Sequence, residues 1–489
     1  MKTITIDPIT RLEGHGKISI FLDDEGNVAD AYLQIPELRG FEKFCVGRPV
    51  EEMPRITTRI CGVCPEAHMM ASAKTCDAVY HVDLPRTAKL LRELLYVIFY
   101  VTDHSTHFYA LGGPDFVMGP DAPAAQRNIL GVIHKVGVEI GRKVIEMRGA
   151  CHELIKMMAG KSVHPIGALP GGMSKGMNRE ERDKVLKTGQ DAVEFAKFTI
   201  GLFNQIVLGN KAYVDLILSD GFTHHTYNMG LVDERNHVNF YDGDIRVTAP
   251  DGGELAKFKP ADYLQHLVEH VEPWSYLKFP ILRKVGWKGL VDGPGSGIYK
   301  ATPLSRLNVS DGMATPLANE EHDRMYKTLG GKPVHQTLAT HWARLVELLY
   351  AAERWVELAS DPDITGADYR VVPSHTPDEG VGVVEAPRGT LYHHYKTDKR
   401  GIVQEANLIV GTTNNNAAIN LSVKKAAMNF IKKGHVTDGL LNIVEMAFRA
   451  YDPCFGCATH AWPGQAAIHI RILDREGNIV RDLRRERRP

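Results

Sequence analysis

The chain has 489 residues, a length that corresponds to about three ordinary domains. Hydrophobic residues make up 44% and charged residues 24%, a balance that excludes an intrinsically disordered or collagen-like chain. Lys and Arg total 58 against 59 Asp and Glu, so a formal charge of -1 gives no overall attraction to nucleic acid or anionic lipid. We expect no nucleic-acid partner.

The first 35 residues predict a small antiparallel β element. Residues 3–6 and 17–21 alternate apolar and polar side chains, and a turn signal follows at 24–27. The start lacks an apolar signal region and a twin arginine, and the apolar stretch 90–101 is too short for a membrane span. We therefore expect a cytoplasmic protein that does not itself cross a membrane.

Helical periodicity dominates the middle of the chain, with strand signals between and after the helices. Apolar residues at helical spacing predict helices over 85–109, 125–159, 179–208 and 335–359. Short strands and Gly/Pro-rich loops between about 220 and 310 indicate a subdomain or an insertion. Strands are expected at 381–395 and 399–410, helices at 417–433 and 439–450, and a hairpin at 466–481 that turns at 476–478. The fold class is a helix-rich α+β unit with small β elements around a helical core.

Two C-x-x-C motifs at opposite ends of the chain carry most of the chemical information. They are Cys61-Gly-Val-Cys64 and Cys454-Phe-Gly-Cys457. This spacing lowers thiol pKa and lets two thiolates reach one metal ion, and four thiolates suit zinc, iron, nickel or copper(I). From spacing alone, a structural zinc site, a thiol redox pair and a catalytic metal all remain open. The other cysteines, Cys45, Cys76 and Cys151, match no ligand pattern and are predicted to be structural.

Ionisable residues lie next to both motifs, and each has two interpretations. Arg59 precedes the first pair and His68 follows it, while Asp452 precedes the second pair and His460 follows it. Such groups often orient metal ligands from outside the ligand set. The alternatives are a surface charge for Arg59, an ordinary buried histidine for His68 and a helix cap for Asp452.

The chain closely resembles the large, catalytic subunit of nickel-iron hydrogenases. The resemblance rests on the segments 59–68 (RICGVCPEAH) and 452–460 (DPCFGCATH), and six further motifs reinforce it in the family's order. These are the segments 7–15, 39–43, 103–109, 160–165, 385–389 and 407–415. The resemblance implies the family fold, a central helical bundle with peripheral β elements. It also implies one large-subunit domain over 1–460, and a tail over 461–489 that resembles the peptide removed during maturation.

The resemblance implies a nickel ion held by all four thiolates. Cys61 and Cys454 would be terminal ligands, and Cys64 and Cys457 would bridge to an iron that carries cyanide and carbon monoxide. Such a centre splits H2 heterolytically. The base would be the thiolate of Cys454, with Glu13 as the next proton carrier, since burial raises the pKa of a carboxylate toward the working pH.

Other matched positions imply roles around the metals. Arg388 would supply fixed positive charge on the open side of the centre; an exposed charge for Glu13 and an ordinary salt bridge for Arg388 are the alternatives. Thr412 would hydrogen-bond a cyanide, and Pro387 would lie beside the diatomic ligands. Glu42, the carbonyl of Leu408 and His460 would bind magnesium. Groups surrounding the ligands would be His68, Asp103, His104, His107, Pro387, Thr412 and Asp452.

The resemblance also implies partners. No iron-sulfur motif is visible, so electrons would leave through the iron-sulfur small subunit, followed by further flavin or iron-sulfur subunits. The segments 392–395 and 412–416 resemble the cytoplasmic bidirectional branch, whose acceptors include NAD(P), ferredoxin, F420 and a disulfide reductase. A maturation endopeptidase would remove 461–489, although an ordinary surface tail fits that segment too.

Three rival functions share parts of this pattern. The related quinone-site subunit of respiratory complexes lacks the full set of four cysteines, whereas this chain has them all. The others are a structural zinc protein and a metal-free assembly protein. Metal analysis distinguishes all three from a hydrogenase.

Overall fold

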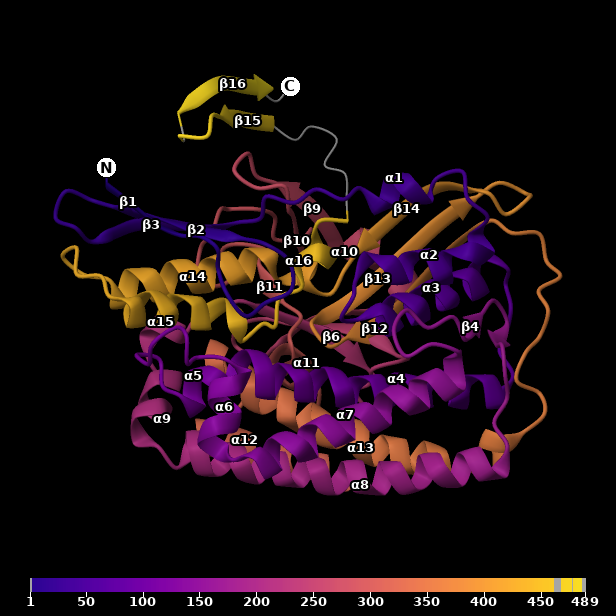
Figure 1. Cartoon of the computed structure of the whole chain (residues 1–489). Helices are drawn as coiled ribbons and strands as arrows, with labels where there is room; N and C mark the ends of the chain where they lie inside the picture. The colour runs from indigo at the N-terminus through magenta and orange to yellow at the C-terminus, as the bar shows by residue number, and fades with distance from the viewer. Residues whose placement is uncertain (1, 461–467, 477, 486–489) are drawn as a thin grey trace.

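Four long helices lie side by side and form the lower half of the molecule as drawn in Figure 1. The computed structural model describes residues 2–460, 468–476 and 478–485. Helix α13 packs against α4 and α8, and α4 packs against α7. Their bounds are Arg86–Thr106 (α4), Val138–Ala159 (α7), Arg179–Phe203 (α8) and Thr340–Ser360 (α13). The helix-rich α+β class is confirmed.

The predicted helix over 125–159 is instead two helices. Helix α6 spans Ile129–Val136, and α7 begins after Gly137, whose φ of 100° is a left-handed conformation that favours glycine. Helix α4 is prolonged by a π-helical turn, His107–Gly112, so the predicted 85–109 helix changes its hydrogen bonding near its end. The other two predicted long helices are confirmed.

Small sheets, antiparallel except for the parallel pair β11 and β6, lie mainly on one side of the long helices (Figure 1). Strands β1 (Lys2–Ile6), β2 (Lys17–Leu22) and β3 (Val28–Gln34) pair in chain order, as the alternation predicts, and Ile18, Ile20 and Leu22 of β2 point inward. Between 227 and 300 a four-stranded sheet has the order β11-β6-β7-β8, and β9 and β10 form a separate pair. Their bounds are Tyr227–Val232 (β6), Asp244–Thr248 (β7), Glu254–Phe258 (β8), Leu267–Val271 (β9), Lys278–Leu282 (β10) and Tyr299–Lys300 (β11).

Another three-stranded sheet lies against a helix that the periodicity did not reveal. Strands β12 (Glu379–Ala386), β13 (Gly389–Thr397) and β14 (Val403–Ile409) form an antiparallel sheet, and α3 (Pro65–Val79) packs on β12 and β13. A Cβ atom at Gly382 would lie 2.3 Å from the Thr75 nitrogen, so glycine permits this close approach. The predicted strand 381–395 is therefore two strands joined by a tight turn at Pro387 and Arg388.

The C-terminal third adds two helices and a hairpin. Helices α14 (Asn416–Phe430) and α15 (Asp438–Arg449) confirm the helices expected at 417–433 and 439–450. Strands β15 (Ile468–Leu473) and β16 (Ile479–Arg485) form the expected hairpin, and residues 466, 467 and 477 of that prediction lie outside the described residues. Within the described ranges, every helix is too short or too polar to cross a membrane.

Candidate metal centre

The two C-x-x-C motifs sit at the ends of short helical segments. A 3-10 turn, η2 (Thr58–Ile60), leads directly to Cys61, and Cys64 immediately precedes α3, where Pro65 occupies the first helical position. Cys454 immediately precedes the short helix α16 (Phe455–Ala458), which contains Cys457. Both motifs therefore present their thiols at a change of backbone direction.

Main-chain hydrogen bonds join the N-terminal segment to the second cysteine motif. The Phe455 N–H donates to the Glu13 carbonyl at 2.9 Å, and the Glu13 N–H donates to the Pro453 carbonyl at 3.3 Å. Gly14 has φ +91°, and a Cβ there would lie 2.9 Å from the Gly456 nitrogen. Glycine is thus required for the two segments to approach each other, and this approach places Glu13 beside Cys454.

Arg39 links the two cysteine motifs, a role that its sequence motif did not reveal. Its guanidinium donates to the carbonyl of Ile60 at 2.5 Å and to the carbonyl of Gly456 at 3.0 Å. These carbonyls belong to the residue before Cys61 and to the residue before Cys457. One side chain therefore ties both ligand-bearing loops together, with the planar fork of donors that arginine provides.

The four sulfurs of the two motifs lie in one buried cluster, all within 4.8 Å of one another. Neighbouring Sγ atoms are 3.3 Å apart for Cys61 and Cys454, 3.0 Å for Cys61 and Cys64, 3.5 Å for Cys64 and Cys457, and 2.9 Å for Cys454 and Cys457. These separations are too long for disulfides, which need about 2.05 Å. The cluster is a set of four free thiols arranged around one point, as a metal ion requires. Cys45, Cys76 and Cys151 are buried and lie outside it.

The pKa values of the four thiols are strongly perturbed. Burial alone would raise the pKa of Cys61, but hydrogen bonds from the other three thiols lower it well below its usual value. Hydrogen bonding with the neighbouring thiols and burial hold the pKa of Cys64 at about 11, and burial raises the pKa of Cys454 and Cys457 well above the ordinary value. Without a cation, the cluster therefore favours a single thiolate. Four thiolates would need a metal to offset their repulsion.

Glu13 contacts the cluster directly. Its Oε2 atom accepts hydrogen bonds from the Cys454 thiol at 2.9 Å and from the Gly456 N–H at 2.8 Å. Burial, followed by the negative charge of Cys61, raises the pKa of Glu13. A carboxylate with a raised pKa in contact with one sulfur has the geometry of a proton carrier.

Arg388 faces the cluster from the turn between β12 and β13. It pairs with Asp103 at 3.0 Å and with Asp452 at 2.9 Å, and all three side chains are nearly fully buried. Burial raises the pKa of Asp452 to about 7 despite the attraction of Arg388. The Nε–H of Arg388 is buried and has no acceptor among the described residues. The guanidinium is therefore a fixed positive charge with one unused donor.

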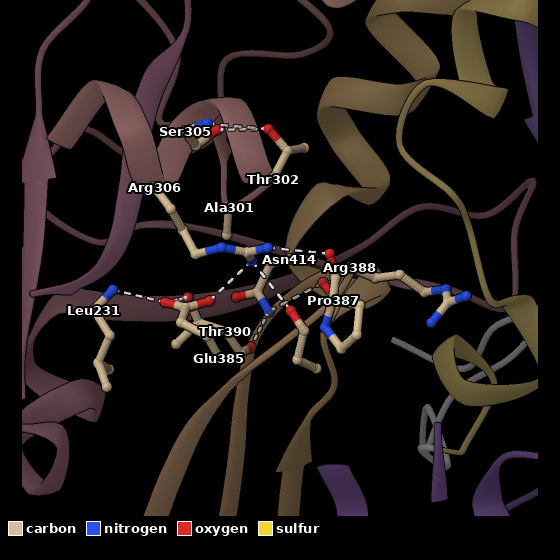
Figure 2. A network of polar contacts seen from close by, with 12 residues as sticks. Leu231, Ala301, Thr302, Ser305, Arg306, Glu385, Pro387, Arg388, Thr390 and Asn414 are labelled. Carbon is tan, nitrogen blue, oxygen red and sulfur yellow. Dashed lines mark hydrogen bonds and ion pairs between the residues drawn. The ribbon is translucent and has the colours of Figure 1, made fainter. Parts of the chain in front are cut away.

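A buried polar network holds this turn in place (Figure 2). The Arg306 guanidinium donates to the carbonyls of Ala386 and Pro387, each at 3.1 Å, and pairs with Glu385 at 3.1 Å and Glu347 at 2.6 Å. Glu385 also accepts the N–H of Leu231 and the hydroxyl of Thr390. The Asn415 amide donates to the Arg388 carbonyl at 2.7 Å. Because all these polar groups are paired inside the core, the main chain of residues 386–388 is fixed in position.

The remaining predicted residues divide into two groups. Thr412 accepts the Cys454 N–H at 2.9 Å, and His68 Nε2 lies 3.6 Å from Cys457 Sγ, so both touch the cysteine motif. His104 instead bonds Glu347 at 2.9 Å, and His107 bonds the Arg449 carbonyl at 2.9 Å. Neither His104 nor His107 has a hydrogen bond with a cysteine in the described part of the chain.

Glu42, Leu408 and His460 meet at a second point. The Leu408 N–H donates to Glu42 Oε1 at 2.9 Å, and His460 Nε2 lies 2.6 Å from the Leu408 carbonyl and 3.8 Å from Glu42 Oε1. Lys278 lies 3.6 Å from Glu42 and 3.0 Å from Glu269. Lys278 and Glu269 were not predicted from the sequence, because their segments match none of the recognised motifs.

A cavity of about 410 Å³ opens beside the first cysteine pair. Gly62, Val63, Glu66 and Asp103 are among its lining residues. Glu66 is 3% exposed, and burial raises its pKa to about 8. The sequence indicated Glu66 only as part of a motif, although a carboxylate in an otherwise apolar helix start was a signal for a special environment.

Known protein families and proteins match nearly the whole chain. Residues 39–129 and 216–460 match the family described as nickel-dependent hydrogenase, and residues 3–38 match the HoxL-like family. The chain belongs to the nickel-dependent hydrogenase family. It is the large, catalytic subunit for H2 oxidation, and the rival quinone-site and zinc functions are not favoured, because this hydrogenase has all four cysteines and they converge. The family and the four-thiol donor set support nickel and iron as its metals.

Individual hydrogenases are similar to the chain in sequence and in structure. An F420-non-reducing hydrogenase iron-sulfur subunit of Archaeoglobus profundus is 48% identical over 99% of this chain and 100% of its own length. The NAD-reducing hydrogenase HoxS subunit beta of Cupriavidus necator is 38% identical over 98% of this chain and 99% of its own. A crystal structure of an NAD+-reducing [NiFe]-hydrogenase in the H2-reduced state superposes with a TM-score of 0.88 at 38% identity, covering 94% of this chain and 100% of that one. This hydrogenase therefore has the predicted large-subunit fold.

Proposed function

We propose that Cys61, Cys64, Cys454 and Cys457 together hold one nickel ion, and that Cys64 and Cys457 also bind an iron. The convergence of four sulfurs from opposite ends of the chain is the observation that supports this assignment. Thiolates are soft ligands that suit both metals, and all four sulfurs of the buried cluster lie within 4.8 Å of one another. When bound, the nickel–iron pair supplies the reversible heterolytic cleavage of H2.

The protein's own contribution to the reaction is to take up and release the proton. The Cys454 sulfur would accept it first, because Glu13 Oε2 lies 2.9 Å away and receives its hydrogen bond. The raised pKa of Glu13 lets this carboxylate carry the proton onward at moderate pH and release it again. The Gly456 N–H holds Oε2 in place at 2.8 Å while the proton moves.

Arg388 is proposed to bind and orient the groups on the open side of the metals. Its two ion pairs with Asp103 and Asp452 fix the guanidinium, and its unused Nε–H can donate to an anionic ligand. The Thr412 oxygen already accepts the Cys454 N–H, which leaves its own O–H to donate. The N–H of Arg388 and the O–H of Thr412 suit an iron that carries cyanide and carbon monoxide. Pro387 is proposed to lie beside these ligands without donating a hydrogen bond. Asp103, Asp452 and His68 support the ligands. His104 and His107 lie farther from the cysteines and contact Glu347 and the Arg449 carbonyl instead.

Magnesium is proposed at Glu42, the Leu408 carbonyl and His460. Burial lowers the pKa of His460, so its ring is neutral and has one N–H. Both ring nitrogens face carbonyl oxygens: Nδ1 lies 2.5 Å from that of Cys457 and Nε2 lies 2.6 Å from that of Leu408. One nitrogen lone pair must therefore face a carbonyl lone pair, and this repulsion would be relieved if both atoms bound the same cation. The nearby carboxylates of Glu42 and Glu269 suit a divalent ion.

Electrons are proposed to leave through an iron-sulfur small subunit, with further flavin or iron-sulfur subunits beyond it. A cavity of about 450 Å³ lies beside the segment that leads into Cys61, and Arg59 lines it together with Phe41, Phe44 and Ile56. Phe44 is 51% exposed, so this face offers a partner an apolar contact close to the metals.

The cellular assignments are proposals based on likeness to relatives. One relative is named as NAD-reducing and another as F420-non-reducing. We propose NAD(P) as the electron acceptor; F420, ferredoxin and a disulfide reductase come from the bidirectional resemblance alone. We place the enzyme in the cytoplasm. The segment 461–489 is proposed to be a maturation peptide that an endopeptidase removes after His460, with residues 1–460 as one domain in which 220–310 is a subdomain or insertion.

The proposed function is tested by purifying the native complex anaerobically. The expected result is H2-dependent reduction of an artificial electron acceptor by a complex that contains an iron-sulfur small subunit. A complex that contains this chain and a full complement of metals, yet shows neither H2 oxidation nor proton reduction, would contradict the proposal.

A further inference from the structure

A buried chain of polar side chains leads away from the sulfur of Cys457. His68 Nε2 lies 3.6 Å from Cys457 Sγ, and His68 Nδ1 lies 3.1 Å from His393 Nε2. His393 Nδ1 lies 2.7 Å from the Tyr395 hydroxyl, which lies 3.0 Å from the hydroxyl of Ser72. Helix α3 provides His68 and Ser72, and strand β13 provides the other two residues. The four side chains thus form one continuous series of hydrogen bonds between a helix and a sheet.

Both imidazole rings in this series are neutral. His68 and His393 are fully buried, and their described hydrogen bonds include no carboxylate. A buried imidazolium with no carboxylate beside it would be a poorly compensated charge, which a protein interior disfavours. Each ring therefore has one N–H and one acceptor nitrogen, and the direction of each hydrogen bond depends on the next.

The direction of the series follows from the sulfur. A metal-bound thiolate has no proton and can only accept, so the N–H of His68 must be at Nε2. His68 Nδ1 is then an acceptor, which requires the proton of His393 at Nε2. His393 Nδ1 must in turn accept from Tyr395, whose oxygen is free to accept from Ser72. Only this one direction satisfies every bond.

We propose that His393 and Tyr395 are positioning residues that hold the His68 ring and stabilise the tautomer whose Nε2–H donates to the Cys457 sulfur. This inference rests on the proposed function, in which Cys457 is a metal ligand. Donation to a thiolate withdraws electron density from it and makes the metal centre easier to reduce. The opposite tautomer would point a lone pair at the sulfur and would have the opposite effect.

The test uses the intact complex and two tyrosines on the same strand. Tyr395→Phe removes the hydroxyl that fixes His393, whereas Tyr392→Phe removes a buried hydroxyl whose described contact is Met229 Sδ at 3.8 Å. Nickel content and the midpoint potential of the nickel electron-paramagnetic-resonance signal are measured for each variant. We expect equal nickel in all proteins. We also expect a more negative potential in Tyr395→Phe alone, by up to a tenfold change in the one-electron equilibrium constant, about 59 mV.

A second substitution separates positioning from packing. In His393→Leu the ring through which Tyr395 acts on His68 is absent. Adding Tyr395→Phe to His393→Leu should therefore cause no further shift. An unchanged potential in Tyr395→Phe, or equal shifts in the Tyr395 and Tyr392 variants, would overturn the inference while leaving the nickel assignment intact. A wild-type complex without nickel would overturn the proposed function and the inference together.

Discussion

Glu13 Oε2 lies 2.9 Å from the sulfur of Cys454, although the two residues are 441 positions apart in the chain. The contact exists because main-chain hydrogen bonds pair the segment around Glu13 with the segment around Cys454. The proton carrier and the sulfur that it serves are thus positioned by backbone, which a side-chain substitution leaves in place.

Replacing Glu13 with Gln should suppress turnover and spare the metals. Gln keeps an oxygen for the Gly456 N–H but cannot take up a proton. We expect H2-dependent dye reduction to fall by on the order of 10²-fold or more, with unchanged nickel and iron content. Glu37→Gln, in the same N-terminal region, is the control because Glu37 contacts His15 instead. Near-normal rates for Glu13→Gln would remove this residue from the proton path.

Thr412 should stabilise the second cysteine motif through one hydrogen bond. Its hydroxyl oxygen accepts the buried Cys454 N–H at 2.9 Å, and Thr412→Val leaves that N–H unsatisfied. The free energy of unfolding should fall by about 1–3 kcal/mol. Thr412→Ser retains the oxygen and should recover most of this loss. Denaturant titration of both variants measures the difference, and equal losses would mean that packing rather than the hydrogen bond matters.

Arg306 should be among the most sensitive buried residues. Arg306→Met leaves the buried carboxylates of Glu347 and Glu385 without the arginine that balances their charge, so the free energy of unfolding should fall by about 3–5 kcal/mol. Arg142 also pairs with two glutamates, Glu139 and Glu146, but at the surface. Arg142→Met should therefore cost about 1 kcal/mol or less. Similar losses in the two variants would contradict the view that the buried network holds the Arg388 turn.

Stability should decrease as the pH falls below about 6.5. Burial lowers the pKa of His341 to about 3, so this ring stays neutral in the folded protein while it gains a proton in the unfolded chain. The unfolded state then binds more protons, and each such histidine reduces the free energy of unfolding by up to about 1.4 kcal/mol per pH unit. The loss extends from about pH 6.5 to about pH 3.

A substitution measures how much His341 alone contributes to the pH dependence of the free energy of unfolding. His341→Gln should reduce the difference in the free energy of unfolding between pH 6 and pH 5 by about 1 kcal/mol. The exposed His435 provides the control, and its Gln variant should keep the wild-type pH dependence. If both variants keep that dependence, His341 is not neutral in the folded protein.

The motifs indicated side chains that lie together in the fold, because metal chemistry restricts residue type and spacing. The four cysteines, Glu13 and Arg388 meet as the motifs indicated. The ion-pair partners of Arg388 could not be predicted, since Asp103 and Asp452 approach it only after α4 and the C-terminal segment have packed. The role of Arg39 in joining the two motifs could not be predicted either, because it donates to main-chain carbonyls, which have no sequence signature.

The fold was predictable for helices and strands that are buried on one side only, because their apolar residues recur at regular spacing. The alternation of β2 and the apolar stripe of α4 predicted the correct elements. Helix α3 was missed because it is buried on nearly every side and so lacks a polar face. The break between α6 and α7 depends on the single left-handed residue Gly137, which interrupts an otherwise continuous helical pattern.

Metal analysis tests most directly whether four distant cysteines share one catalytic centre. Nickel and iron are quantified in the anaerobically purified complex for the wild type, for Cys457→Ser and for the control Cys151→Ser, whose thiol is buried elsewhere in α7. Iron must be counted relative to the iron-sulfur partners. We predict one nickel per chain in the wild type and the control, and no nickel in Cys457→Ser. One zinc without nickel in the wild type, or full nickel occupancy in Cys457→Ser, would contradict the account.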